Sequence, residues 1–106
     1  MYIHFRIDWS NALPWTWDPD KAAVNLRKHA VSFQLAERVF DDPYCRVMED
    51  PYPYEERWRT MGRPDPNRSI LLVVVHTWPD DHEPGRIISA REATSHERRA
   101  YEEDRA

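Results

Sequence analysis

The sequence predicts an α+β domain built around an antiparallel sheet, and three observations support this fold class. The apolar run at residues 70–78 is rich in β-branched side chains and too short to span a membrane, so it predicts a buried strand. It is the third of four strand-like segments that follow one another through short connections, which favours an antiparallel meander. Helical patterns lie before and after these strands rather than between them, which argues against a doubly wound fold.

The N-terminal part of the chain is expected to contain a strand and then a helix. Residues 2–9 alternate apolar and polar side chains, as a half-buried strand does. Asp18 is a good N-cap and Pro19 suits the first helical position, so the first helix should begin here. Lys28 and His29 fall in its last turn, where positive charge interacts favourably with the helix dipole.

The apolar spacing predicts which faces of two successive helices are buried. Ala22, Leu26 and Ala30 share one face of the first helix, with Ala23 beside them. The second helix should begin after the cap Ser32, with Leu35, Ala36, Val39 and Phe40 on its buried face. It should stop at residues 41–43, which end in proline.

Two shorter strands are expected before the long apolar run. In residues 44–49, either Cys45 and Val47 or the residues that alternate with them point inward, and the period alone does not choose. Residues 56–61 alternate as a second strand, and the turn-rich residues 62–68 connect it to the apolar run.

The last part of the chain predicts a strand that passes directly into a helix. Residues 86–91 should pair with the apolar run across the loop at 79–85. Thr94 can cap the helix while Glu97 reaches back to its backbone N–H, which is a capping box. The expected strand ends just after residue 91, where the helix follows. Arg98 and Tyr101 share one face of that helix. This segment is the most promising place for chemistry.

Composition limits the class of protein. A chain of 106 residues is expected to form one domain, and its formal charge of −4 does not suggest a general nucleic-acid binder. Only Lys21 and Lys28 are lysines, so the basic residues are mostly arginines, which suit bidentate contact with phosphate. The single Cys45 fits a reducing compartment, and the N-terminus lacks a signal-peptide pattern. We therefore expect a cytoplasmic protein without membrane contact.

A series of short motifs along the chain carries a family resemblance. In order, these are Trp17-Asp18-Pro19, Lys21-Ala22, Asn25, Lys28-His29, Val31-Ser32-Phe33, Ala36, Val39-Phe40-Asp41, Arg57, Gly62, Val73-Val74-Val75, Arg86-Ile87-Ile88-Ser89-Ala90-Arg91, Ala93-Thr94, Glu97-Arg98 and Tyr101. Their order and spacing resemble the BrnT toxins, the DUF497 group, from about Trp15 to Glu103. Ala30 departs from the pattern, because the family usually has glycine there, at a plausible helix C-cap.

The resemblance implies a fold and a domain organisation. The implied fold is RelE-like, with a four- to five-stranded antiparallel sheet, two N-terminal helices on one face and a C-terminal helix. Residues 15–106 would form the single toxin domain, and residues 1–14 would be an N-terminal extension that contains the expected strand.

The resemblance also implies a function and partners. It implies a ribonuclease toxin of a type II toxin–antitoxin system that blocks translation by cutting RNA. A BrnA-like ribbon-helix-helix antitoxin would neutralise it in a heterotetramer of two toxins and two antitoxins. Operator DNA would be contacted only through the antitoxin.

Metal-independent RNA cleavage needs a base, an acid and cations at the scissile phosphate. No metal or other cofactor is expected, because the histidines, the cysteine and the acidic residues lack zinc-ligand spacing. The candidate catalytic residues are Arg91, Arg98, His29, Lys28 and Tyr101, and the candidates for RNA-phosphate binding are Arg57 and Arg63. We expect Arg91 and Arg98 to converge on one pocket.

Structural roles compete with each of these assignments. Arg91 and Glu97 are spaced to form an ion pair at the strand–helix junction, Tyr101 could pack in the core, and His29 could simply end a helix.

Two alternative functions stay open. The chain could be a catalytically silent BrnT-like module that acts only in an autorepressor complex, which its acidic balance favours. Direct DNA recognition by the last helix is a weaker alternative, since the sequence lacks a helix-turn-helix pattern. The residues expected on a partner surface are Trp15, Trp78, Tyr52 and Tyr54.

Overall fold

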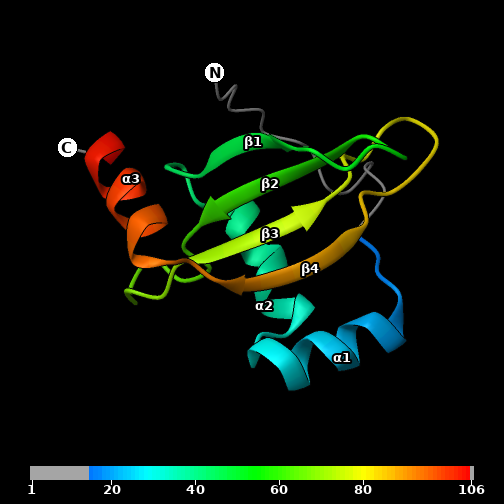
Figure 1. Ribbon diagram of the computed structural model, residues 1–106, viewed down its shortest axis with the longest axis horizontal. Coiled ribbons are helices and arrows are strands. Elements are labelled where there is room, and N and C mark those ends of the chain that lie inside the picture. The colour runs from blue at the N-terminus through cyan, green and yellow to red at the C-terminus, as the bar shows by residue number, and fades with distance from the viewer. Residues whose placement is uncertain (1–14, 106) are drawn as a thin grey trace.

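The computed structural model describes residues 15–105 and shows an α+β domain with a four-stranded antiparallel sheet and three α-helices (Figure 1). The elements in chain order are α1 (Pro19–His29), α2 (Phe33–Glu37), the 3-10 helix η1 (Arg38–Asp41), β1 (Arg46–Asp50), β2 (Arg57–Gly62), β3 (Leu72–His76), β4 (Ile87–Glu92) and α3 (Ser95–Arg105). The expected strand at residues 2–9 and the N-terminal extension lie outside the described residues. None of the described helices is both long enough and apolar enough to cross a membrane.

The sheet is the expected meander, with the strand order β1-β2-β3-β4 and every pair antiparallel. One register row joins Arg46, Met61, Val73 and Arg91 across all four strands. Because side chains alternate between the two faces of a strand, these four residues share one face of the sheet. Their chain neighbours therefore face the other way.

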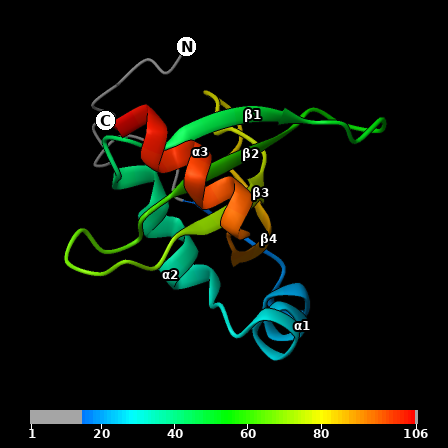
Figure 2. The ribbon, with the colours of Figure 1, turned by 60° about the vertical axis from the view of Figure 1, so that its left-hand side comes forward.

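Helices pack against both faces of the sheet, and the long apolar strand β3 supplies side chains to both (Figures 1 and 2). On one face, Leu72 and Val74 belong to a buried cluster with residues of α2 and β4. On the other face, Leu71 and Val73 form a smaller cluster with Tyr101 of α3. This double burial explains why the sequence of β3 is continuously apolar rather than alternating.

The expected buried face of α1 is wrong in part. Leu26 is 52% exposed and Ala23 is also exposed, whereas Asn25 is buried. The Asn25 amide nitrogen donates to the backbone oxygens of Val31 and Ala90 at 3.0 and 2.8 Å, and its oxygen accepts from the Ala90 N–H at 3.1 Å. The helix therefore docks through a polar side chain that pairs with the outer edge of β4, a contact that hydrophobic spacing does not reveal.

The helix starts follow the sequence closely, but the expected second helix changes after Glu37 into the 3-10 helix η1. The Asp18 side chain accepts from the N–H groups of Asp20 and Lys21, and the Ser32 hydroxyl accepts from Leu35. Before and within β1, Cys45 is buried and Val47 is half-buried. Of the two alternatives for this strand, the one with Cys45 and Val47 pointing inward is therefore correct.

An aromatic cluster closes the end of the sheet where β3 stops. Trp15, expected on a partner surface, is instead only 8% exposed and stacks on Phe40 with ring centroids 4.0 Å apart. Gly85 lies so close to this indole that a Cβ there would overlap with the ring atoms of Trp15. His76 is fully buried beside both rings.

His76 is held as a neutral group. Its Nδ1 lies 3.0 Å from the Thr77 carbonyl oxygen, which can only accept, so Nδ1 carries the proton. Nε2 then accepts from the Thr60 hydroxyl at 2.7 Å. Burial lowers the pKa of His76 to about 4, with the Thr77 hydrogen bond opposing the shift.

Replacing Ala30 by glycine should stabilise the fold. Ala30 is the one described non-glycine residue with a positive φ, 57°, at the C-cap of α1. An L side chain is strained in this conformation, so Ala30→Gly is expected to raise the free energy of unfolding by about 1 kcal/mol in urea titrations. Ala23→Gly, in the exposed interior of the same helix, is the matched control and should lower it by a similar amount. If Ala30→Gly lowered the free energy of unfolding as Ala23→Gly does, this account would be wrong.

The stability of the fold should fall in acid through His76. Because the folded pKa of His76 is depressed to about 4 from an ordinary 6.5, the unfolded chain binds the proton more readily between these values. Stability is therefore fully present above about pH 6.5 and is lost as the pH falls to about 4, by about 3 kcal/mol. His76→Gln should flatten the pH dependence in this window, while His82→Gln in an exposed loop should leave it unchanged. Parallel pH profiles of the wild type and His76→Gln would overturn the assignment.

Candidate functional site

The junction of β4 and α3 is held by a bidentate ion pair between Arg91 and Glu97. The two guanidinium nitrogens lie 2.7 and 3.0 Å from the two carboxylate oxygens. The Thr94 N–H donates to Glu97, and the Glu97 N–H donates to the Thr94 hydroxyl, which confirms the expected capping box. The hydrogen bond from Arg91 is the largest of the effects that lower the pKa of Glu97 to about 2. Glu97 is therefore ionised at neutral pH and is a weak base.

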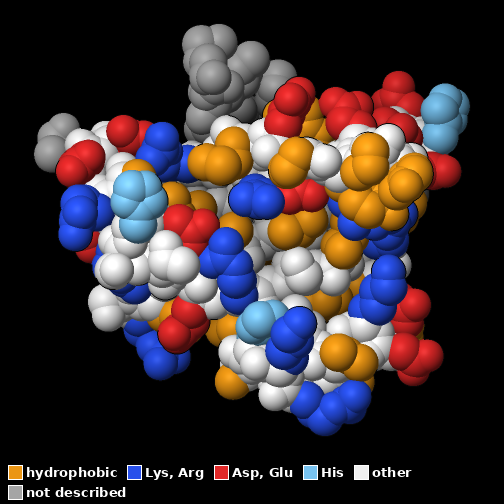
Figure 3. All heavy atoms as spheres, viewed as in Figure 1, with side chains coloured by type: hydrophobic (Ala, Val, Ile, Leu, Met, Phe, Trp, Pro, Cys, Tyr) orange, Lys and Arg blue, Asp and Glu red, His pale blue; other side chains and the backbone are white. Residues whose placement is uncertain are grey.

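Arginines line the sheet face on which α3 packs. Arg57 and Arg59 of β2 alternate with Trp58 and Thr60, and the register places them on the same face as Arg91. Each is paired with a carboxylate: Arg59 Nε lies 2.7 Å from Asp50, and Arg57 Nε lies 2.8 Å from Glu55. At the other end of β1, Arg46 Nε lies 2.8 Å from Asp104 of α3. In Figure 3, Lys and Arg side chains are spread across this face between α3 and the loops at the far end of the sheet.

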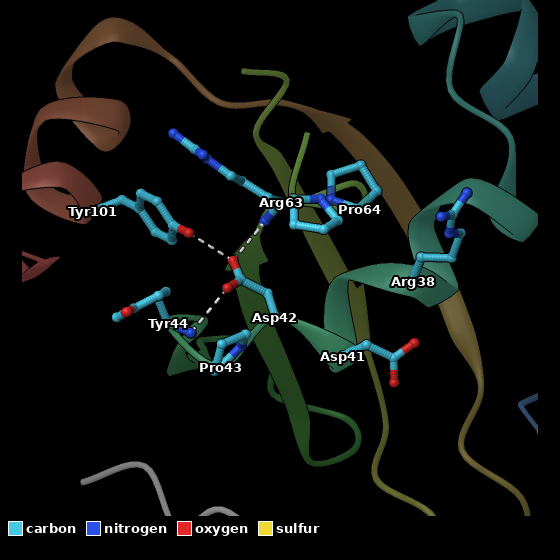
Figure 4. A pocket seen from close by; sticks show the side chains of 9 residues that line it. Arg38, Asp41, Asp42, Pro43, Tyr44, Arg63, Pro64 and Tyr101 are labelled. Atoms are coloured by element: carbon cyan, nitrogen blue, oxygen red, sulfur yellow. Dashed lines mark hydrogen bonds between the residues drawn. The ribbon is translucent and has the colours of Figure 1, made fainter. Parts of the chain in front are cut away.

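A second feature is a pocket where η1, the segment after β2 and α3 meet (Figure 4). Its volume is about 280 Å³, and it is lined by Arg38, Asp41, Asp42, Pro43, Tyr44, Arg63, Pro64, Pro66 and Tyr101. At its centre the buried Asp42 carboxylate accepts from the Tyr101 hydroxyl at 2.7 Å and from the N–H groups of Arg63 and Tyr44 at 2.8 and 2.9 Å. One side chain therefore joins three segments of the chain.

The approach of Asp42 to β2 depends on Gly62. A Cβ at this position would come within 3.0 Å of the Asp42 carboxylate and of Val39, so a larger residue would push η1 away from the strand. Arg63 directly follows Gly62, and its side chain extends away from Asp42 toward α3 (Figure 4). The Arg63 Nε is buried without a hydrogen-bond partner, which leaves one donor of this guanidinium unused.

The structure brings some of the expected site residues together and separates others. Arg63 and Tyr101 line the pocket, whereas Arg91 and Arg98 do not, so the pocket is not the point of convergence expected for these two arginines. Arg98 instead lies 3.7 Å from Glu102 in the next turn of α3. Arg57 shares the sheet face with Arg91.

The two candidates from α1 lie on a different element. Lys28 is exposed and His29 is half-buried in the last turn of α1, which packs on β4 through Asn25. Among residues 15–105, no hydrogen bond or ion pair joins either of them to Arg91 or Arg98. Their catalytic roles, like those of the other candidates, stay predictions.

Two residues of the pocket and the sheet face carried no assigned role at the sequence level. Asp42 was expected only to end a helix, because nothing in a local pattern reveals partners 21 and 59 residues away. Arg59 could have been found, since its alternation with Arg57 already predicts that the two share a face. Within the part of the chain that is described, no group of three or more His, Cys, Asp or Glu side chains is placed to hold a metal ion.

Comparison with known families gives this fold an identity. The fold is a small α+β domain with arginines on one sheet face, and residues 17–97 match a family described as "Ribonuclease toxin, BrnT, of type II toxin-antitoxin system". The class is therefore that of the ribonuclease toxins that are paired with an antitoxin. Because the match covers most of its length, the chain belongs to the BrnT toxin family, which confirms the resemblance. Among curated proteins, no sequence matches the chain.

Removing the Tyr101 hydroxyl should destabilise the fold. Tyr101→Phe keeps the buried ring but takes one donor from the Asp42 carboxylate, so we expect the free energy of unfolding to fall by about 1–2 kcal/mol. Tyr54→Phe is the matched control, because that side chain is exposed and its loss of a hydroxyl should change stability by less than about 0.5 kcal/mol. Urea titrations of the three proteins measure the difference. Indistinguishable midpoints for all three would rule out a structural role for the hydroxyl.

Proposed function

We propose that this BrnT-family protein blocks translation by metal-independent RNA cleavage and that a BrnA-like antitoxin neutralises it. The observation that best supports the proposal is the row of arginines on the sheet face that α3 covers only in part. Arginine is suited to this task because its planar guanidinium can contact a phosphate through two hydrogen bonds.

Strand alternation places several arginines on the same side of the sheet. Arg57 and Arg59 share a face, while the exposed Glu49 of β1 pairs with Trp58 and therefore faces the other side of the sheet. Asp50, opposite Arg57, lies on the arginine side and is paired with Arg59. We call this side of the sheet, with Arg46, Arg57, Arg59 and Arg91, the arginine face. An RNA strand bound there would meet carboxylates that are already paired with guanidinium groups.

The arginines of these ion pairs can also contact a phosphate. The Arg91 and Glu97 side chains are 38% and 26% exposed, and Arg59 and Asp50 are 38% and 15% exposed. A guanidinium has five N–H donors, more than one carboxylate takes up, so a partly exposed arginine can contact a phosphate without releasing its carboxylate. We assign Arg91 the main role at the scissile phosphate, with Arg57 and Arg98 as further cations. Arg63 is the proposed phosphate contact on the pocket side, because its side chain lines the pocket.

The proton-transfer roles are proposed for histidine. Glu97 is a weak base because its pKa is held at about 2. An imidazole can both accept and donate a proton, so His29 is kept as the candidate base or acid, with the exposed His96 beside Glu97 as a second candidate. Tyr101 is assigned to positioning, because its ring is buried and its hydroxyl binds Asp42.

The antitoxin completes the proposed system. Family membership implies an antitoxin partner. We further propose that it is a ribbon-helix-helix protein, that two toxins and two antitoxins form a heterotetramer, and that operator DNA is contacted only by the antitoxin. The proposed location is the cytoplasm, where the RNA substrate is found.

Loss of the Arg91 guanidinium should abolish cleavage without unfolding the protein. Arg91→Ala is expected to lower the RNA cleavage rate by about 100-fold or more, because it removes a cation from the reacting phosphate. The measurement is cleavage of a labelled single-stranded RNA in EDTA, together with growth arrest on induction. Co-expression of the antitoxin should restore growth in cells that make the wild-type protein.

Glu97→Gln is the matched control. It breaks the charge pair but keeps Arg91, and glutamine also fits the capping box at this position. We expect this variant to cleave within a few-fold of the wild type, while both variants lose similar stability. Equal loss of cleavage in both would mean that the ion pair matters only for structure.

The alternative is a catalytically silent binding module in an autorepressor complex. It is favoured by the pairing of Arg46, Arg57, Arg59 and Arg91 with carboxylates, which leaves little free positive charge. A wild-type protein that binds the antitoxin tightly but leaves RNA intact and cells growing would establish this alternative and refute the nuclease.

A further inference from the structure

The loop between β1 and β2 presents two tyrosines to solvent. Tyr54 is 84% exposed and Tyr52 is 38% exposed, and their rings meet edge to face with centroids 5.4 Å apart. A side chain that is 84% exposed adds little to a core, so packing alone does not account for Tyr54. Trp78 is also exposed, but its ring contacts His76 and Phe40 in the aromatic cluster and belongs to that cluster.

The loop is held in place by its own residues. Pro51 and Pro53 flank Tyr52 and fix two φ angles. The Arg57 guanidinium lies over the Tyr52 ring at 3.6 Å from its centroid, which is a cation–π contact. Glu55 accepts from this same guanidinium and also pairs with Arg86 near the start of β4. The tyrosine rings are therefore presented by a loop that is fixed to two strands.

The tyrosines lie at the far end of the arginine face. Strand β1 runs from Arg46, which is paired with α3, to Asp50, which lies opposite Arg57 and next to the loop. Four residues of strand span about 13 Å, so the face extends over this length between the Arg91 row and the loop. In Figure 3, hydrophobic side chains gather at this end of the face, with Lys and Arg side chains between them and α3.

We propose that Tyr52 and Tyr54 form a stacking platform for unpaired bases of the RNA, away from the bond that is cut. This inference rests on the proposed function and adds that the substrate is single-stranded RNA at this end of the surface. Every base has an aromatic face, so stacking on tyrosine selects for an unpaired base rather than for a sequence. Arg57 fits the same role, because it orders the Tyr52 ring and can also contact the RNA backbone. In a duplex the bases are stacked on each other and are not available to these rings.

Binding of an uncleavable RNA tests the platform directly. The probe is a fluorescein-labelled, 2′-O-methyl single-stranded oligonucleotide, and the readout is fluorescence anisotropy with the full-length protein. Tyr54→Ala should weaken binding by about fivefold to a hundredfold, whereas Tyr54→Phe should stay within about twofold because it keeps the ring. Leu26→Ala, which removes an exposed apolar side chain from α1, is the matched control and should bind like the wild type. A perfect duplex of the same sequence should bind more weakly and should not respond to Tyr54→Ala.

The possible failures are distinguishable. If the wild type binds the single strand and Tyr54→Ala binds equally well, the platform is refuted while the proposed nuclease stands. If the wild type neither binds nor cuts any RNA, the proposed function fails and the platform fails with it. If Tyr54→Ala binds RNA normally but no longer co-purifies with the antitoxin, the tyrosines belong to a protein interface and the inference is wrong. Thermal unfolding of each variant confirms that the fold is intact.

Discussion

The side-chain amide of Asn25 is the contact on which the arrangement of the N-terminal half depends. It satisfies the backbone N–H and C=O of Ala90 on the outer edge of β4 and also holds the Val31 carbonyl that follows α1. An edge strand with unpaired backbone groups can recruit another chain, and here an amide takes the place of a neighbouring strand. The same side chain holds the backbone just after α1 and the backbone next to Arg91. Burying this amide is favourable only because its oxygen and nitrogen both find partners.

Local patterns predicted the elements of this fold well because the chain marks its helix ends with strong chemical signals. Asp18, Ser32 and Thr94 all cap as expected, and the alternation in β2 and the continuous apolar run of β3 gave the meander. The buried face of α1 was missed for a physical reason. Hydrophobic spacing assumes that a helix docks through apolar residues, whereas α1 docks through an amide and leaves Leu26 in solvent.

The candidate site was predictable only where it is local in sequence. The Arg91–Glu97 pair spans six residues and could be anticipated from the strand–helix junction, including its structural alternative. The Asp42 carboxylate collects donors from two distant segments, and its position depends on a glycine whose role is visible only when η1 and β2 are seen together. The arginine face could be predicted in part. Strand alternation predicts which arginines share a side of the sheet, but it does not predict which carboxylates pair with them. The catalytic assignments stay predictions, because the pocket lacks Arg91 and Arg98.

The C-terminal helix is fastened near both of its ends, and this has a consequence for how the protein opens. Its first turn is tied to β4 through Glu97, while Tyr101 and Asp104 tie its later turns to Asp42 and to the first residue of β1. Terminal helices commonly fray independently of the domain that bears them. Here the attachments reach both outer strands of the sheet, and Tyr101 is buried against β3, so we expect α3 to unfold together with the sheet. A partner that binds this helix is therefore expected to stabilise the whole folded domain and not the helix alone.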